Sequence, residues 1–358
     1  MTIQTERLDR LPSLYATDPQ GMLELLLDFP AQCESAWRLG LEGRFRKQAF
    51  DRIHFLGMGG SAIGGDLIRA YLENKLATPI FIHRSYELPV TVGRSSLVFA
   101  VSYSGNTEET LTAYQSARKR GAHLVAVTSG GMLLQRARRD GIPYVQIPSG
   151  FPPRAALGYL FFVPLLLLCR QAGVHIPDAE FLEMMRLLVK LRDTEFAPVV
   201  PSSQNLSKRL ALELFGHIPA IYAGVSRVDV VAVRWRGQIA ENAKQLSWHH
   251  LFPEMNHNEI MGWHHPKRLF SSLKLLFLRD RGDFRQVQRR MEITRSLITR
   301  EAGVQALEVW SRGKGLLARL FSLIYIGDFV SYYLASLNRV DPTPVGRIEE
   351  LKRRLSRR

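Results

Sequence analysis

Hydroxyl side chains gather in one short stretch of this chain, Ser-Tyr-Ser-Gly-Asn-Thr at residues 102–107. The hydroxyls belong to Ser102, Ser104 and Thr107, and two glutamates follow them. A turn of this kind between a strand and a helix can hold a phosphate monoester, because hydroxyls and the backbone N–H groups of a helix N-terminus favour an anion without a fixed cation. The alternative is that the serines only cap the helix.

A second turn of the same kind comes earlier, Gly-Met-Gly-Gly-Ser at residues 57–61. Gly59 and Gly60 would let the backbone approach a ligand closely, and Ser61 adds a hydroxyl at the start of a helix. No lysine follows as in a Walker loop, and the spacing is not that of a dinucleotide-binding fingerprint. A tight turn without a ligand is the alternative, but two such turns on neighbouring strands favour a phosphate site.

The elements that must position these turns follow from the hydrophobic pattern. From residue 52 onward, short apolar runs alternate with helical stretches, which predicts a parallel sheet covered by helices on both faces. The predicted strands are residues 53–56, 80–83, 97–102, 123–128 and 144–147. Ligands of such sheets bind at the carboxyl ends of the strands, so we expect both turns at one edge of the sheet.

A second, weaker cycle of strands and helices follows. Its expected strands are residues 218–224, 273–279 and 306–310, and its expected helices are residues 230–244, 283–300 and 316–337. Residues 8–41 predict two N-terminal helices broken around Pro30. The predicted fold class is therefore α/β, with two units that each contain a parallel sheet flanked by helices on both faces. The expected domain limits are residues 1–48, 49–185 and 186–358.

Composition limits the classes of function. The chain has 358 residues, of which 46% are hydrophobic and 23% charged, which is typical of a folded protein of about two domains. The only cysteines are Cys33 and Cys169, and no signal peptide is visible, so a cytoplasmic protein is expected. The apolar run of residues 157–169 contains Pro164 and is too short to span a bilayer, so it predicts a buried helix.

The formal net charge of +15 suits an anionic ligand. No aromatic residues interleave with the basic runs, which we interpret as solvated faces, so neither nucleic acid nor a membrane is an expected partner. Metal-ligand spacings such as HExxH do not occur, and no acidic ribose partner follows a GxGxxG turn. We therefore expect no metal and no cofactor.

Several segments together resemble a known family. Gly59-Gly60-Ser61 and residues 102–107 are similar to the two loops of the sugar isomerase (SIS) domain. A resemblance to the bifunctional phosphoglucose/phosphomannose isomerases continues in the same order through residues 152–159, 236–244, 252–260, 341–345 and 351–352. This resemblance implies two SIS-type units. It also implies an aldose-ketose isomerase that interconverts glucose 6-phosphate and/or mannose 6-phosphate with fructose 6-phosphate.

The same resemblance implies the catalytic residues. Glu241 would move a proton between C1 and C2 through an enediolate, and a carboxylate suits this step because partial burial can raise its pKa toward the working pH. His257, donated by the partner subunit of a homodimer, would open the sugar ring, since histidine both gives and takes a proton near neutral pH. Arg154 would stabilise the enediolate oxygen, and Lys352 would assist ring opening.

These residues also have structural interpretations. Glu241 could pair with Lys244 on a helix face, Arg154 could be a surface residue, and Lys352 could belong to a solvated basic helix. Residues 245–251 differ from the more apolar segment of the relatives, which bears on substrate preference. Four other histidines are interpreted as structural: His249, His250, His264 and His265.

The alternative functions are a non-catalytic sugar-phosphate-binding regulatory SIS protein and an isomerase of another phosphosugar.

Overall fold

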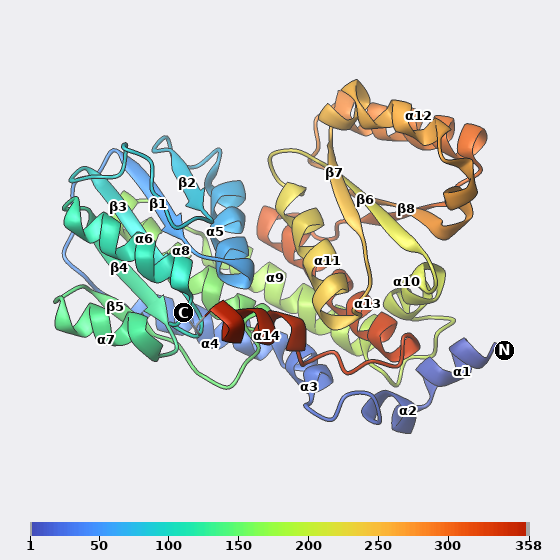
Figure 1. Cartoon of the computed structure of the whole chain (residues 1–358), viewed down its shortest axis with the longest axis horizontal. Coiled ribbons are helices and arrows are strands. Elements are labelled where there is room, and N and C mark those ends of the chain that lie inside the picture. The colour runs from blue at the N-terminus through green and yellow to red at the C-terminus, as the bar shows by residue number, and fades with distance from the viewer. Residues whose placement is uncertain (1, 356–358) are drawn as a thin grey trace. The chain divides into compact units, whose positions relative to one another are not determined.

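The computed structural model describes residues 2–355, which form two compact units (Figure 1). The first-sheet unit comprises residues 28–185 and 315–317. The second-sheet unit comprises, of the described residues, 2–27, 186–314 and 318–355. The outermost expected domain limits, residues 1 and 358, lie outside the described residues.

Five parallel strands form the sheet of the first-sheet unit, in the order β2-β1-β3-β4-β5. The strands are β1 (Arg52–Leu56), β2 (Ile80–His83), β3 (Ser96–Val101), β4 (His123–Thr128) and β5 (Tyr144–Gln146). The helices are α4 (Phe29–Glu42), α5 (Gly59–Leu72), α6 (Glu108–Lys119), α7 (Gly131–Arg139), η1 (Pro153–Ala155) and α8 (Leu157–Ala172), and α9 (Asp178–Leu191) begins in this unit. The α/β architecture expected from the sequence is confirmed.

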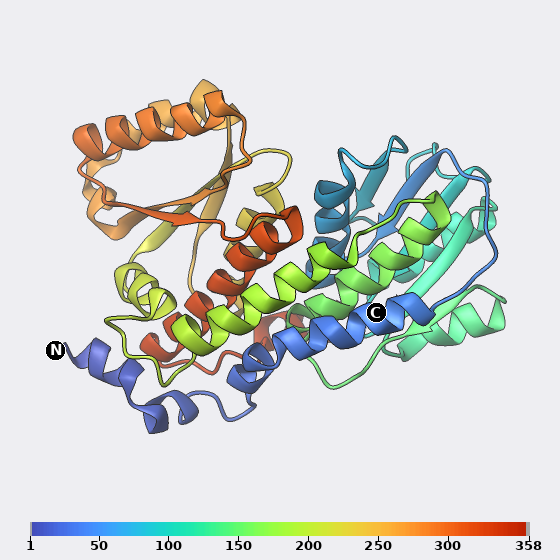
Figure 2. The ribbon, with the colours of Figure 1, turned by 180° about the vertical axis from the view of Figure 1, so that it is seen from behind.

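This sheet is buried on both faces, which explains the continuous apolar runs of its strands; all six residues of β3 are buried. Helices α6 and α7 pack on one face, where Tyr114 and Leu133 join the same cluster as Val98. On the other face Phe55 and Phe99 stack with ring centroids 4.9 Å apart. Helix α5 lies against α8, and α8 runs beside α4 (Figure 2). Helix α8 includes the apolar run with Pro164 and is buried, as expected.

Four parallel strands form the sheet of the second-sheet unit, in the order β7-β6-β8-β9. They are β6 (Ile218–Gly224), β7 (Trp248–Phe252), β8 (Leu273–Arg279) and β9 (Ala306–Trp310). The longer helices are α10 (Leu206–Leu214), α11 (Asp229–Asn242), α12 (Arg285–Ala302), α13 (Leu316–Leu337) and α14 (Gly346–Leu355). Short helices are α1 (Ile3–Asp9), α2 (Leu11–Tyr15), α3 (Met22–Leu27), η2 (Arg192–Phe196), η3 (Glu254–His257), η4 (Glu259–His264) and η5 (Lys267–Ser272).

Helices cover both faces of this second sheet as well. Helix α12 packs on one face, where Met291 joins Tyr222, Phe277 and Trp263 in an apolar cluster. Helices α11 and α13 lie on the other side of the strands (Figure 1). Among the described helices α13 is the one long and apolar enough to cross a membrane, yet its whole apolar stretch is buried inside the fold. We therefore interpret α13 as a core helix.

The sequence prediction fails at strand β7 and in the N-terminal region. Strand β7 was not predicted, because it lies at the sheet edge with four of its five residues only half buried and therefore has no continuous apolar run. The N-terminal region forms four helices rather than two, because the carboxylate of Asp18 accepts the N–H groups of Met22 and Leu23 at 2.8 Å each and starts a separate helix. Pro30 lies in the first turn of α4, which a proline tolerates.

Candidate active site

The hydroxyl-rich turn connects the end of β3 to the first turn of α6. The hydroxyls of Ser102 and Thr107 are hydrogen-bonded at 3.0 Å. Thr107 occupies the N-cap position of α6, but its side chain makes no cap bond, contrary to the capping alternative. Gly105 has a φ of +68° and its N–H donates to the Ser102 carbonyl at 3.1 Å, which folds the turn back on itself. Ser104 is exposed.

The loop that follows β4 contacts the hydroxyl-rich turn and holds its conformation. A Cβ atom on Gly105 would lie 1.9 Å from the Gly130 carbonyl oxygen, so the two backbones touch and only glycine fits. The side-chain oxygen of Asn106 accepts the Met132 N–H at 3.0 Å. Ser129 donates both its N–H, at 2.9 Å, and its hydroxyl, at 2.6 Å, to the Tyr103 carbonyl. The conformation of the turn is therefore set by contacts with the next loop along the sheet edge.

The glycine-rich turn lies at the same sheet edge and is joined to the first. Helix α5 begins at Gly59, which is exposed, and the N-cap position has no side-chain cap bond. A Cβ atom on Gly60 would lie 2.9 Å from the Pro153 carbonyl oxygen, which explains the glycine there. The Ser61 hydroxyl accepts the Tyr103 N–H at 3.3 Å. The N-termini of α5 and α6, where helix dipoles favour an anion, are thus linked by Ser61.

Tyr103 also connects the hydroxyl-rich turn to the segment that carries Arg154. Its hydroxyl donates to the Pro148 carbonyl at 3.0 Å and accepts the Phe151 N–H at 2.8 Å. Arg154 follows in η1 and is 4% exposed, so the surface alternative for it is wrong. Sequence reasoning assigned no role to Tyr103, although its place between two candidate serines was a usable signal.

Gln32, on α4, holds the other side of the Arg154 segment. Its side-chain amide donates to the Ala155 carbonyl and its oxygen accepts the Gly158 N–H, both at 2.8 Å. Gln32 is buried, and a Cβ atom on Gly158 would lie 2.9 Å from its side-chain oxygen. The sequence around Gln32 carries no signal of this role, because the contact joins residues far apart in the chain.

Glu241 lies in the last turn of α11, in the second-sheet unit, and is half buried. The ammonium of Lys244 donates to the main-chain carbonyl of Glu241 at 2.5 Å and to that of Pro342 at 3.4 Å. Lys244 itself has a φ of +55°, which ends the helix immediately after the candidate base. The structure therefore fixes the backbone at Glu241 through the residue with which sequence reasoning paired it.

His257 and Lys352 belong to the same unit and are both exposed. His257 is the last residue of η3, and the neighbouring Asn256 donates to the Thr294 hydroxyl at 2.8 Å, which ties η3 to α12. Lys352 lies on α14, in which no residue is buried. That exposure fits the solvated-helix interpretation of Lys352.

Two of the other histidines interpreted as structural, His250 and His264, have local partners. His249 and His250 lie on β7, and burial together with the positive charge of Arg236 lowers the pKa of His249. The Leu251 N–H donates to Nδ1 of His250 at 2.7 Å. Nδ1 of His264 lies 3.1 Å from the Met261 carbonyl oxygen. Within residues 2–355, no group of three or more His, Cys, Asp or Glu side chains is placed to hold a metal ion.

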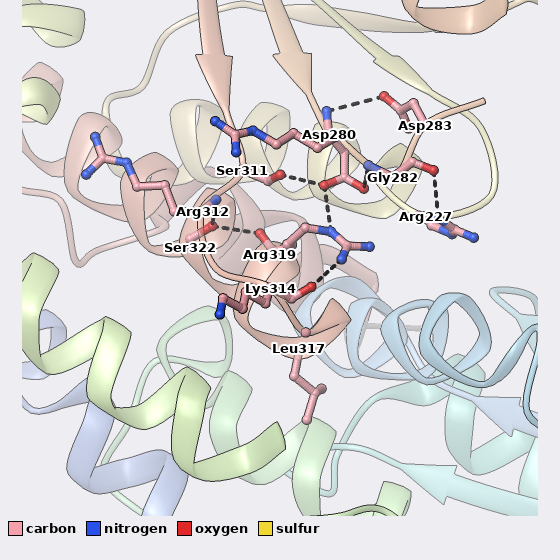
Figure 3. Close-up of polar contacts among 12 residues, drawn as sticks. Arg227, Asp280, Gly282, Asp283, Ser311, Arg312, Lys314, Leu317, Arg319 and Ser322 are labelled. Atoms are coloured by element: carbon pink, nitrogen blue, oxygen red, sulfur yellow. Dashed lines mark hydrogen bonds and ion pairs between the residues drawn. The ribbon is translucent and has the colours of Figure 1, made fainter. Parts of the chain in front are cut away.

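The corresponding edge of the second sheet has a different chemistry (Figure 3). The loop after β8 carries Asp280, whose carboxylate accepts the Ser311 hydroxyl at 2.5 Å and Nε of Arg319 at 2.9 Å. Asp283 accepts the Asp280 N–H at 3.3 Å, and burial, with the nearby Asp280 charge, raises the pKa of Asp283 to about 6. Arg227 donates to the Gly282 carbonyl at 2.7 Å. The carboxylate of Asp280 is thus already bonded to groups of the second-sheet unit, whereas the first-sheet edge presents the hydroxyls of Ser102 and Thr107.

Comparisons with known proteins agree with this architecture. Residues 47–138 match the family described as "SIS domain", and residues 203–355 match "Bacterial phospho-glucose isomerase C-terminal SIS domain". Together with the two parallel sheets, these matches confirm the two expected SIS-type units.

Relatives with similar sequences cover nearly the whole chain. The chain is 43% identical to the bifunctional phosphoglucose/phosphomannose isomerase of Caldicellulosiruptor bescii, over 94% of this chain and 99% of the relative. Identity to the protein of the same name from Aquifex aeolicus is 37%, over 85% of this chain and 90% of the relative. Among solved structures, a hypothetical protein from Thermus thermophilus has a TM-score of 0.74 at 17% identity, over 99% of this chain and 95% of that chain. At that identity the structural likeness supports the fold alone.

Proposed function

Since this chain belongs to the family of bifunctional phosphoglucose/phosphomannose isomerases, we propose that it interconverts glucose 6-phosphate and/or mannose 6-phosphate with fructose 6-phosphate. The reaction is an intramolecular oxidoreduction, in which one sugar carbon is oxidised while its neighbour is reduced. The observation that carries the proposal is the hydroxyl-lined turn of residues 102–107, which Ser61 and Tyr103 join to the uncapped N-terminus of α5.

The phosphoryl group of the substrate binds at this edge of the first sheet. Its ligands are the backbone and hydroxyl groups of Gly59, Gly60, Ser61, Ser102, Ser104 and Thr107. Helix dipoles and hydroxyls supply partial positive charges in place of a fixed cation, so the site holds a dianion and still releases the product.

A single base, Glu241, can serve both glucose 6-phosphate and mannose 6-phosphate. Glu241 removes the C2 proton of the open-chain aldose and returns it to C1, while a proton moves between the two oxygens. The enediolate between these steps has lost the configuration at C2, so glucose 6-phosphate and mannose 6-phosphate give the same intermediate. Arg154 stabilises its charged oxygen, and His257 and Lys352 transfer protons during ring opening. None of these steps requires a metal ion.

A coupled assay tests the proposed function directly. Purified protein is given glucose 6-phosphate or mannose 6-phosphate, and formation of fructose 6-phosphate is followed with each. Turnover of either substrate supports the isomerase. Binding of both without turnover would support the regulatory alternative, and turnover of only another phosphosugar would support an isomerase of different specificity.

We further propose a homodimer in which His257 completes the site of the partner subunit. In support, His257 is exposed and next to a groove between η3–η4 and α12, lined by apolar and basic residues that include Ile260, Ile293 and Arg290. Met261 and Ile293 are 70% and 50% exposed, so this surface carries apolar side chains that a second copy would cover.

Mixing two inactive variants tests this arrangement. In a hybrid of Glu241→Gln and His257→Ala chains, the histidine variant retains its own Glu241 and receives His257 from the other chain. One site per hybrid is then intact, so refolding an equal mixture restores about a quarter of wild-type activity. No recovery in a mixture that forms dimers would show that His257 acts within its own chain or not at all.

Two coarser points belong to the same proposal. We propose the division into residues 1–48, 49–185 and 186–358; in support of its second limit, the family matches at 47–138 and 203–355 fall one on each side of residue 186. A cytoplasmic location is supported by the two cysteines, which are both unpaired and buried.

A further inference from the structure

A row of polar contacts joins α11, which carries Glu241, to one face of α13. Arg234 and Gln238 both donate to the carboxylate of Asp328, at 2.6 Å from Nη2 and 2.9 Å from Nε2. Four residues further along α11, the side-chain amide of Asn242 donates to the Ser331 hydroxyl at 2.9 Å. The row continues past the end of α11, where the amide of Asn338 donates to the Ala243 carbonyl at 3.0 Å and to the Gln245 side chain at 2.9 Å.

Close backbone packing accompanies this row. The indole N–H of Trp235 donates to the Leu323 carbonyl at 2.9 Å. A Cβ atom on Gly327 would lie 2.3 Å from the same indole nitrogen, so no larger residue fits there. The middle of α11 therefore packs closely against α13, and the C-terminal half of α11 is hydrogen-bonded to α13.

The side chains of this row are buried, and burying polar and charged groups costs desolvation free energy. Asp328 and Arg234 are 2% and 4% exposed, while Asn242 and Ser331 are fully buried. Burial raises the pKa of Asp328 even though Arg234 and Gln238 favour the charged form. Apolar residues of similar size would often hold two helices together at least as well as a buried ion pair. Hydrogen bonds are directional and apolar contacts are not, so the polar row is better suited to hold α11 in one rotation about its axis.

Rotation of α11 decides where the Glu241 side chain points. Successive residues of a helix are about 100° apart around the axis, and Arg234, Gln238 and Asn242 follow one another at intervals of four. Bonds from these three side chains therefore hold one face of α11 against α13. Glu241 precedes Asn242 directly, so its direction is fixed by the last bond that a side chain of α11 itself makes to α13.

We propose that Ser331, through its hydrogen bond to Asn242, is a positioning residue for Glu241, with Asp328 as the next anchor along the helix. This inference rests on the proposed function, in which Glu241 moves the proton. Positioning acts on the chemical step, because a misplaced base slows proton transfer while substrate binding at the first sheet is unaffected.

Helix α13 offers a matched control, Ser322. Both serines are fully buried, and each hydroxyl donates to a carbonyl three residues earlier: Ser331 to Asp328 at 2.7 Å and Ser322 to Arg319 at 2.8 Å. Each also accepts one outside donor, but that of Ser322 is the Arg312 N–H, at 2.8 Å, on the loop after β9 (Figure 3). Ser331→Ala and Ser322→Ala therefore remove equivalent bonds, and only the first touches α11.

The experiment compares kcat and KM of these variants with fructose 6-phosphate. We expect Ser331→Ala to lower kcat about tenfold with KM within about twofold of wild type, and Ser322→Ala to leave both within about twofold. Ser331→Thr, which keeps the hydroxyl, should restore most of kcat. In a Glu241→Gln background, Ser331→Ala should cause no further loss, because the group it positions is already gone.

Equal kcat values for Ser331→Ala and Ser322→Ala would overturn the inference, and so would a further tenfold loss in the Glu241→Gln background. Should Ser331→Ala fail to fold, Ser331→Cys keeps the side-chain size with a weaker acceptor and takes its place in the same comparison. A wild-type protein without isomerase activity would instead overturn the proposed function, and a fully active Glu241→Gln variant would overturn the assignment of the base. These failures are distinguishable from that of the inference, which requires an active wild type and an impaired Glu241→Gln.

Discussion

The hydroxyl oxygens of Ser102 and Thr107 lie 3.0 Å apart across the start of α6, one at the end of a buried strand and the other at the helix N-cap. This bond holds together the two ends of a turn whose third hydroxyl, on Ser104, is exposed. The N-terminus of α6 has no side-chain cap bond, so its first N–H groups are not closed off by Thr107.

Ser102→Ala should raise KM for fructose 6-phosphate by about tenfold to a hundredfold, the range for removing a hydrogen bond to a charged group. Ser96→Ala is the control, since Ser96 lies at the opposite end of β3 and is fully buried, and its hydroxyl bonds with the loop of residues 91–93 among the contacts described. Steady-state kinetics checks the prediction. A KM effect equal in both variants would indicate general damage to the strand.

Glu241→Gln should leave fructose 6-phosphate binding largely intact while lowering turnover by at least about a hundredfold, because the amide cannot accept the proton. Calorimetric titration measures the binding, and the coupled assay measures the turnover. Near-normal turnover would remove Glu241 from its proposed role.

Tyr103→Phe should lower kcat/KM about tenfold, because it removes the bonds to Pro148 and Phe151 that fix the segment before Arg154. Tyr114→Phe is the matched control: that hydroxyl is bonded to Asp140 at 3.2 Å, and the side chain is fully buried on α6. Kinetics of both variants, alongside their melting temperatures, separates an effect on the site from an effect on stability.

Treatment with a chelator such as EDTA should leave activity unchanged, since the proposed proton transfers use only side chains. The rate before and after dialysis against the chelator checks this. Loss of activity that zinc restores would contradict the metal-free mechanism.

Asp283→Asn should stabilise the protein at pH 8. Burial raises the pKa of Asp283 from 3.8 to about 6, so the folded state holds this proton more tightly than the unfolded state does. Stability therefore falls as pH rises from about 4 to 6, and above pH 6 the charged carboxylate costs roughly 1–3 kcal/mol.

Melting temperatures at pH 4 and pH 8 test this sign. The gain from Asp283→Asn should be present at pH 8 and vanish near pH 4. Asp193→Asn is the contrasting control, because its hydrogen bond with Arg192 lowers the pKa of Asp193, so that substitution should give no gain at pH 8. The same change in melting temperature with pH in both variants would contradict the raised pKa of Asp283.

The sequence predicted most strands because their residues are buried on both faces of a sheet. For example, β6, β8 and β9 have the predicted limits. It failed at β7, whose half-exposed residues lack that signal. The hydroxyl-rich turn could be predicted since its composition is local. The bonds of Gln32 to the Arg154 segment and of Asp328 to Arg234 could not, because each partner alone resembles an ordinary polar helix residue.

The two sheet units share an architecture, but the chemical groups at the carboxyl ends of their strands differ. This difference limits the number of phosphate groups that one chain can bind. At the second edge Asp280 forms an ion pair with Arg319, whereas the turns at the first edge carry the hydroxyls of Ser102 and Thr107. A titration with inorganic phosphate should therefore saturate at one equivalent per chain, even though the fold is built twice.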